Sequence, residues 1–109
     1  MKYYRYLYSS DSIKHVDKLK IKLNLRKGIP GVYILAFGSD SKQLEIINSL
    51  YLKLNYYRKH PPVVVGICKS YDEAVDMVIK IVNESYQKTG NCSIRDYLIK
   101  RAKTRDFTI

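Results

Sequence analysis

The amino-acid sequence lacks tryptophan and contains few cysteine, histidine, glycine and proline residues. Its two cysteines, Cys68 and Cys92, and its two histidines, His15 and His60, are scattered along the chain without the close spacing of metal ligands. This scarcity argues against a metal centre and against a small fold held together by disulfide bonds. We expect reduced thiols, no metal and no cofactor.

Long hydrophobic runs are also missing. A membrane-spanning helix needs about 20 consecutive apolar residues, and no segment approaches that length. The first ten residues lack the apolar stretch of a signal peptide. The chain has 109 residues, of which 46% are hydrophobic. These features predict one soluble cytoplasmic domain spanning residues 1–109, with residues 104–109 either a flexible tail or paired at a sheet edge.

Acidic residues are outnumbered by basic ones, ten against twenty, so the formal net charge is +10. Most of the excess lies towards the two ends of the chain. Residues 1–30 carry eight Lys or Arg against two acids, whereas residues 61–90 have a small acidic excess. Because a basic surface attracts phosphate regardless of sequence, the charge keeps nucleic acid among the candidate partners.

The clearest structural unit runs from Pro62 to Gly90. The β-branched apolar run from Val63 to Ile67 is typical of a strand buried on both faces. Ser70 and Glu73 then have the spacing of a capping box, which predicts a helix start. Apolar residues at helical spacing follow, and Gly90 ends the pattern. The apolar face of this helix is wide, so we expect it to pack along most of its length.

Comparable patterns predict the other elements. Residues 3–8 alternate as in a strand, and residues 32–37 form a second buried apolar run. Helices are expected at residues 43–59 and 94–102. The resulting order, β-α-β-α-β-α-α, predicts an α/β fold with a small open sheet of about three mainly parallel strands joined by crossover helices.

Residues 13–26 fit two structures. Ile13, Val16, Leu19 and Leu23 follow a helical stripe, but Leu19 to Leu25 also alternate as in a strand that would form a hairpin with residues 32–37. We predict the helix, because its lysines are good helix formers and cap residues precede it. The helix implies an all-parallel sheet and leaves Ile21 and Leu25 for a second subunit.

This helix would carry a row of basic residues on its outer face, which makes it the candidate nucleic-acid site. The row consists of Lys14, Lys18, Lys22 and Arg26, spaced four residues apart. A solvated helix face is the ordinary explanation of such a row. Helix-turn-helix, zinc-finger and RNA-binding signatures are all missing from the sequence.

A second candidate site lies at the carboxyl ends of the predicted parallel strands, where ligands of open α/β sheets bind. Its candidate ligand-binding residues are Ser39, Asp40, Ser41, Cys68, Lys69 and Ser70. The segment from Gly66 to Ser70 partly resembles a phosphate-binding loop, but it lacks the second glycine of that motif. Helix capping explains the same serine and aspartate residues without any ligand.

Cys68 is the one candidate nucleophile. Its place near a helix N-terminus and beside Lys69 favours the thiolate form. The sequence places no base next to it, so a buried structural thiol is the favoured interpretation. We predict no catalytic residues, although an enzyme remains an alternative.

The segments QLEI, YYRKHPP, VGI and YDEAV, with the sequence around them, resemble a family of short bacterial proteins of unknown function. The resemblance covers about the whole chain. It implies a small stand-alone bacterial protein and brings no catalytic residues with it.

These observations predict a small interaction or regulatory module that self-associates, as a homodimer, and has no catalytic activity of its own. More apolar residues are available than one core stripe would use, which suggests a second subunit or another protein partner. Two alternatives stay open. One is nucleic-acid binding through the basic helix face, and the other is a small anionic ligand or an enzymatic reaction at the strand ends.

Overall fold

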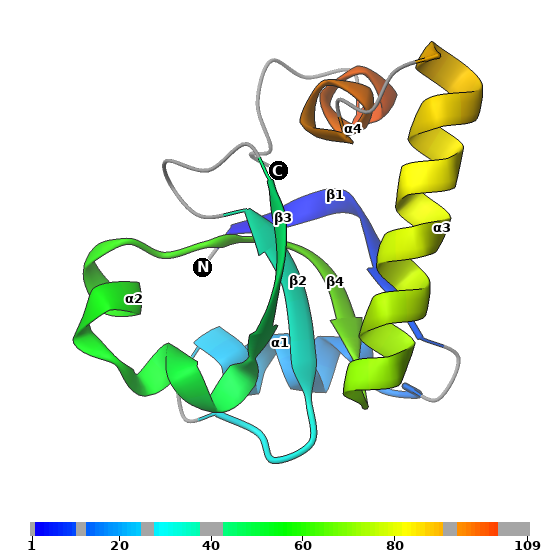
Figure 1. The fold of residues 1–109 in the computed structure, drawn as a ribbon. Coiled ribbons are helices and arrows are strands. Elements are labelled where there is room, and N and C mark those ends of the chain that lie inside the picture. The colour runs from blue at the N-terminus through cyan, green and yellow to red at the C-terminus, as the bar shows by residue number, and fades with distance from the viewer. Residues whose placement is uncertain (1, 11–12, 25–27, 38–42, 91–93, 103–109) are drawn as a thin grey trace.

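The computed structural model describes residues 2–10, 13–24, 28–37, 43–90 and 94–102 (Figure 1). The described residues form a four-stranded sheet whose order is β1-β4-β2-β3. Its strands are β1 (Lys2–Ser9), β2 (Tyr33–Phe37), β3 (Leu44–Asn48) and β4 (Val63–Cys68). The helices are α1 (Val16–Asn24), the 3-10 helix η1 (Ser49–Lys53), α2 (Asn55–Lys59), α3 (Tyr71–Thr89) and α4 (Ile94–Ala102).

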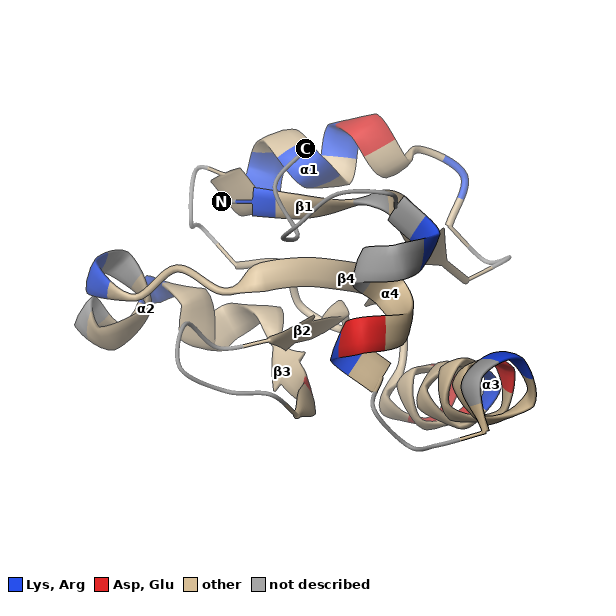
Figure 2. Cartoon of the chain, turned by 90° about the horizontal axis from the view of Figure 1, so that it is seen from above, with Lys and Arg blue, Asp and Glu red and all other residues tan. Residues whose placement is uncertain are grey.

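The sheet is mixed. β1 and β4 are parallel, with Lys2 opposite Val63, whereas β4 and β2 are antiparallel, with Tyr33 opposite Cys68. β2 and β3 form an antiparallel pair without any shift in register. Viewed from above, the four strands lie side by side, with α1 beyond β1 at one end and β3 at the other (Figure 2).

The prediction of about three mainly parallel strands joined by crossover helices is therefore wrong. Residues 43–59 do not form one helix, because Leu44–Asn48 is strand β3, followed by η1 and α2. Leu44 and Ile46 alternate with Glu45, and this short period competes with the helical one. The side chain of Asn48 accepts a hydrogen bond from the Leu50 N–H (3.1 Å), which caps η1 where the strand ends.

Helix α1 agrees with the helix predicted within residues 13–26 and excludes the alternative strand. The all-parallel sheet that we derived from it is wrong, however, because β2 runs antiparallel to both of its neighbours. Ile21 is exposed, as the helical register requires, whereas Leu25 lies outside the described residues. The strand parallel to β1 is therefore β4, and β2, which follows α1, runs in the opposite direction.

Both faces of the sheet are buried. On one face, Tyr4, Leu35, Phe37 and Val65 pack against α3 and α4. On the other face, Ile34, Val64 and Ile67 pack with Leu23 of α1 and Leu52 of η1. β4 contributes fully buried residues to both clusters, as its continuous β-branched run predicts.

The termini of α3 agree with the sequence pattern. Ser70 Oγ accepts a hydrogen bond from the Glu73 N–H (3.1 Å), and the Glu73 carboxylate accepts one from the Lys69 N–H (3.0 Å). Gly90 ends the helix in the left-handed region, with φ of 73°. These contacts also hold the backbone of the β4–α3 connection in place.

Two glycines with the same backbone conformation provide a test of the η1 packing. We expect Gly90→Ala to lower the free energy of unfolding by about 1 kcal/mol, because only the left-handed conformation opposes the new methyl group. We expect a loss about 1–3 kcal/mol larger for Gly28→Ala, because its Cβ would also lie 3.0 Å from the backbone Cα of Leu50. Urea unfolding followed by circular dichroism measures both. Equal losses would show that Gly28 does not pack against η1.

Candidate functional site

The parallel pairing of β1 and β4 brings two segments of the predicted strand-end site together. The Ser10 N–H donates to the Ile67 carbonyl (3.1 Å), so the end of β1 lies beside Cys68, Lys69 and Ser70. A pocket of about 310 Å³ opens there, between Ser9 and Ser10 on one side and Glu73 and Asp76 of α3 on the other. Two carboxylates against one lysine, Lys80, in its described lining make this pocket poorly suited to an anion.

The other half of the predicted site follows β2 in the sequence. Ser39, Asp40 and Ser41 lie outside the described residues. They follow Phe37, which pairs with Val63 at the far end of β4 from Cys68. Because β2 is antiparallel to β4, its carboxyl end points away from the rim where β1 and β4 end. The expectation that these serines gather with Cys68 depended on the parallel sheet.

The position of Cys68 is that of a structural thiol. Its side chain is fully buried, and its Sγ lies 3.6 Å from the Sδ of Met77. Burial, followed by the negative charge of Glu73, raises the pKa of the Cys68 thiol from the ordinary value of 9.0 to about 11. The neighbouring Lys69 therefore does not produce a thiolate at neutral pH, and the buried position agrees with the structural thiol that the sequence favoured.

The tyrosines of β1 have structural partners rather than a free stacking surface. Tyr4 is buried, and its hydroxyl donates to the Leu98 carbonyl of α4 (2.7 Å). The Tyr8 hydroxyl donates to Glu84 of α3 (2.9 Å) and accepts a hydrogen bond from Arg101 of α4. Burial and the Glu84 carboxylate raise the pKa of Tyr8. This cluster fastens β1 to α3 and α4.

The basic residues of α1 acquire a neighbour that the sequence did not suggest. Lys14, Lys18 and Lys22 line a pocket of about 410 Å³, and Lys69 from the β4–α3 connection lines the same pocket. Arg26, the last member of the predicted row, lies outside the described residues. The structure thus combines residues from two candidate sites, one predicted for nucleic acid and one for a small ligand. Blue segments mark the lysines along α1 in Figure 2.

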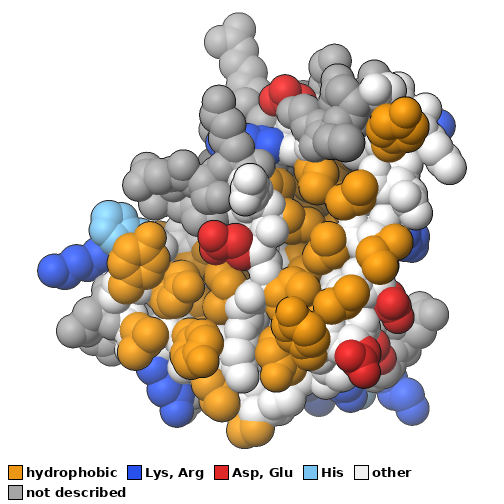
Figure 3. Space-filling model, viewed as in Figure 1, with side chains coloured by type: hydrophobic (Ala, Val, Ile, Leu, Met, Phe, Trp, Pro, Cys, Tyr) orange, Lys and Arg blue, Asp and Glu red, His pale blue; other side chains and the backbone are white. Residues whose placement is uncertain are grey.

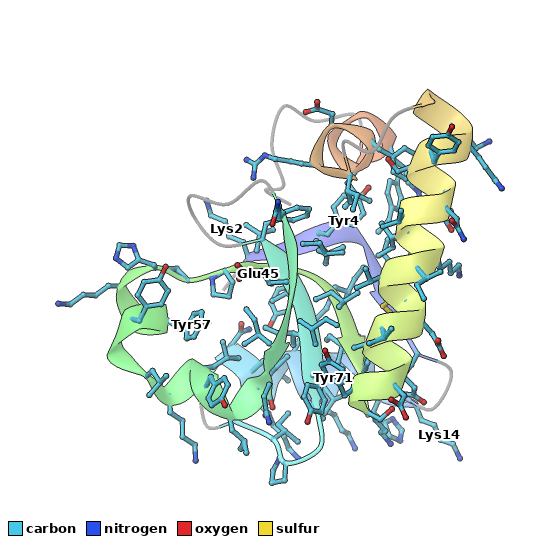
Figure 4. All side chains as sticks on the ribbon, viewed as in Figure 1. Lys2, Tyr4, Lys14, Glu45, Tyr57 and Tyr71 are labelled. Carbon is cyan, nitrogen blue, oxygen red and sulfur yellow. The ribbon has the colours of Figure 1, made fainter. Side chains whose placement is uncertain are left out.

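A third surface is apolar and surrounds the edge strand β3. Hydrophobic side chains gather across this face in Figure 3. Tyr57 and Tyr71 lie on opposite sides of β3, with Glu45 on the strand between them (Figure 4). We call this the β3-edge surface. It consists of β3 and the exposed apolar residues of the segments on its two sides, namely Leu50, Tyr51, Leu54 and Tyr56 in residues 50–56 and Tyr71, Ile79 and Tyr86 on α3.

Sequence analysis missed most of this surface. The single helix predicted at residues 43–59 does not form, and Tyr51 and Leu54 within that range are exposed. The contribution of α3 was detectable. Tyr71, Val75, Ile79, Val82 and Tyr86 fall on one stripe at helical spacing, beside the core stripe that contains Ala74 and Ile81. At the N-terminal end of this stripe, the Tyr71 ring packs edge-on against the Tyr33 ring of β2, with 5.9 Å between the ring centroids.

Comparison of the chain with protein-family models, with curated proteins and with solved structures gives no match. The resemblance to short bacterial proteins therefore stays a prediction. Among the described residues, no group of His, Cys, Asp and Glu is arranged to hold a metal ion. The described helices are each too short or too polar to cross a membrane.

Thiol reactivity tests the burial of Cys68. In a Cys92→Ser chain, Cys68 is the remaining cysteine, and a pKa of about 11 leaves about a hundredfold less thiolate at pH 8 than a pKa of 9.0 would. We expect slow reaction with a disulfide reagent in the folded state and rapid reaction in urea. Fast reaction in the folded state, with a rate that titrates below pH 9, would contradict the buried position.

Proposed function

We propose that this protein is an interaction module that self-associates as a homodimer through the β3-edge surface. The observation that carries the proposal is an edge strand flanked on both sides by exposed large apolar side chains. Monomeric proteins seldom expose a contiguous apolar patch of this kind unless it is a binding surface. The proposal assigns no reaction to the chain, because Ser70 and Glu73 are engaged in helix capping and Cys68 is buried.

The two edges of the described sheet differ in their suitability for pairing. β1 has a register irregularity between Tyr3 and Tyr8, and such irregularities protect an edge by bending it away from a partner. β3 pairs with β2 residue for residue, from Tyr33 opposite Asn48 to Phe37 opposite Leu44. β3 therefore presents the straighter edge of the two.

A second copy of the chain fits this edge by symmetry. Antiparallel pairing of β3 with its own copy creates a two-fold axis perpendicular to the sheet, so each face of one sheet continues into the same face of the other. The exposed stripe of α3 then faces its counterpart on one side. The residues of η1 and α2 face theirs on the other side. One apolar surface thus supplies both halves of the interface.

The distribution of charge also favours a second copy of the chain at the β3-edge surface. Two copies of a chain with a net charge of +10 repel each other, so their interface must lie where basic groups are few. Within the described part of β3 and the exposed stripe of α3, the charged residue is the acid Glu45. Lys53 and Lys59 of η1 and α2 are exposed beside the surface, where they could approach the Glu45 of a partner.

Substituting one exposed isoleucine at a time tests the surface. We expect Ile79→Lys to weaken the dimer at least tenfold, because Ile79 is 53% exposed on α3 and a lysine there would be desolvated in the interface. Ile21→Lys is the matched control, since Ile21 is 61% exposed on α1, away from β3. Equilibrium sedimentation at micromolar concentration gives the dissociation constants.

The folded state of each variant is checked by its urea midpoint, which neither exposed substitution should move substantially. A wild-type chain that is monomeric throughout the micromolar range would refute self-association. A dimer that Ile21→Lys weakens and Ile79→Lys leaves intact would instead place the interface on α1.

A further inference from the structure

The pocket beside α1 is formed by segments far apart in the sequence. We call it the basic pocket, lined by Lys14, Lys18, Lys22 and Lys69, with Ile13, Leu19 and His15 completing the wall. Lys18 and Lys22 lie one turn apart on α1, Lys14 precedes the helix, and Lys69 comes from the connection after β4. Lys14 is labelled in Figure 4, where its side chain extends from the lower edge of the molecule.

Backbone contacts hold these segments together. The hydrogen bond from the Ser10 N–H to the Ile67 carbonyl ties the start of the β1–α1 connection to the end of β4. The Ile13 N–H donates to the Ser10 carbonyl (3.0 Å), which turns the chain towards α1. On the opposite wall, the Glu73 carboxylate holds the Lys69 N–H. The positions from which the lysines extend are therefore set by the fold, although their ammonium groups are in solvent.

The charged residues in the described lining of the basic pocket are of one sign. Among the described residues that line it are four lysines and no carboxylate. None of these lysines makes an ion pair with another described residue. Asp17, the acid of α1, is exposed outside the lining, and Glu73 is engaged with the backbone of Lys69. Four positive charges that line one hollow attract an anion and disfavour a cation there.

The shape and floor of the pocket narrow the choice of anion. Its volume of about 410 Å³ is within the range of small-molecule sites. Ile13 is buried and Leu19 is half-buried, so the wall between the lysines is apolar. A simple inorganic ion would use the charges and leave the apolar wall unoccupied. A ligand that carries phosphate groups on a flat, weakly polar body would use both.

We propose that the basic pocket binds a nucleotide unit, with its phosphates held by the lysines and its base against Ile13 and Leu19. The unit has the same chemistry as a free nucleoside triphosphate or as one link of a single-stranded nucleic acid. The proposal goes beyond self-association, since it concerns another surface. α1 and β3 lie at opposite ends of the sheet in Figure 2, so a dimer formed through β3 leaves both basic pockets accessible.

Binding is measured by fluorescence anisotropy with a labelled 12-nucleotide oligothymidylate and by calorimetry with ATP, both at about 50–200 mM salt. Each lysine that neutralises a phosphate of a single strand contributes about 0.7 to the slope of log K against log salt. We therefore expect a slope of up to about −2.8 for the strand. At 0.1 M salt, removing Lys18 and Lys69 together should weaken strand binding about 25-fold.

The matched control is a chain with the same number of substitutions outside the pocket. Lys18→Met with Lys69→Met is compared with Lys80→Met with Lys88→Met, which removes the same charge from exposed positions on α3. We expect the α3 pair to retain binding within about threefold. The pocket pair should be about as stable as the wild-type chain without ligand, because its substitutions replace exposed lysines that make no ion pair with a described residue.

The outcomes separate the sources of the ligand. Binding of the strand but not of ATP, lost in the pocket pair alone, supports a nucleic-acid site, and the reverse supports a free nucleotide. Equal losses in both pairs would show attraction by net charge and overturn the pocket, as would no binding of either probe at 50 mM salt. Tripolyphosphate that binds as tightly as ATP would overturn the role of the apolar wall. Ile79→Lys, which targets the dimer, should leave ATP binding unchanged.

Discussion

The pairing of β4 with two different partners organises the whole molecule. β4 is held by β1 on one edge and by β2 on the other, in opposite senses, and its residues from Val64 to Cys68 are fully buried. Its two faces are covered because α1 and η1 pack on one of them and α3 and α4 pack on the other. The parallel partner places Ser10 beside Ile67, and that contact brings α1 next to Lys69. The basic pocket is thus a consequence of strand pairing rather than of any local motif.

The elements with a strong local signal could be predicted from sequence. β4 has a β-branched run, and α3 has Ser70 at its start and Gly90 at its end. Leu44–Asn48 could not be settled in this way, because five residues satisfy a strand period and a helical one equally well. What decides the outcome is the pairing of Ile46 with Leu35, a contact that becomes available only when β2 lies beside it. The prediction of strand direction was wrong for the same reason, since no local pattern encodes which edge of β4 pairs with β2.

The candidate sites were likewise predictable only in part from the sequence. The lysine row was visible in the sequence, but its meeting with Lys69 depends on pairing between β1 and β4, about 60 residues apart. The second apolar stripe of α3 was also visible, whereas the exposed position of Tyr51 and Leu54 followed only from the loss of the expected helix. Cys68 is buried, as the favoured interpretation of the sequence had it. Lys69 and the helix start suggested a thiolate, but burial of the side chain dominates and raises the pKa.

The central place of β4 also sets the order in which the sheet can assemble. β2 and β3 are neighbours in sequence and can close a hairpin by themselves, whereas the partner of β1 in the described part of the chain is β4, at residues 63–68. At about 5–20 residues per second, a ribosome adds the intervening residues over several seconds. During that time, the tyrosine-rich β1 segment remains without the sheet and without α4, which accepts the Tyr4 hydrogen bond. Completion of the N-terminal strand is therefore a late event, governed by the second half of the chain.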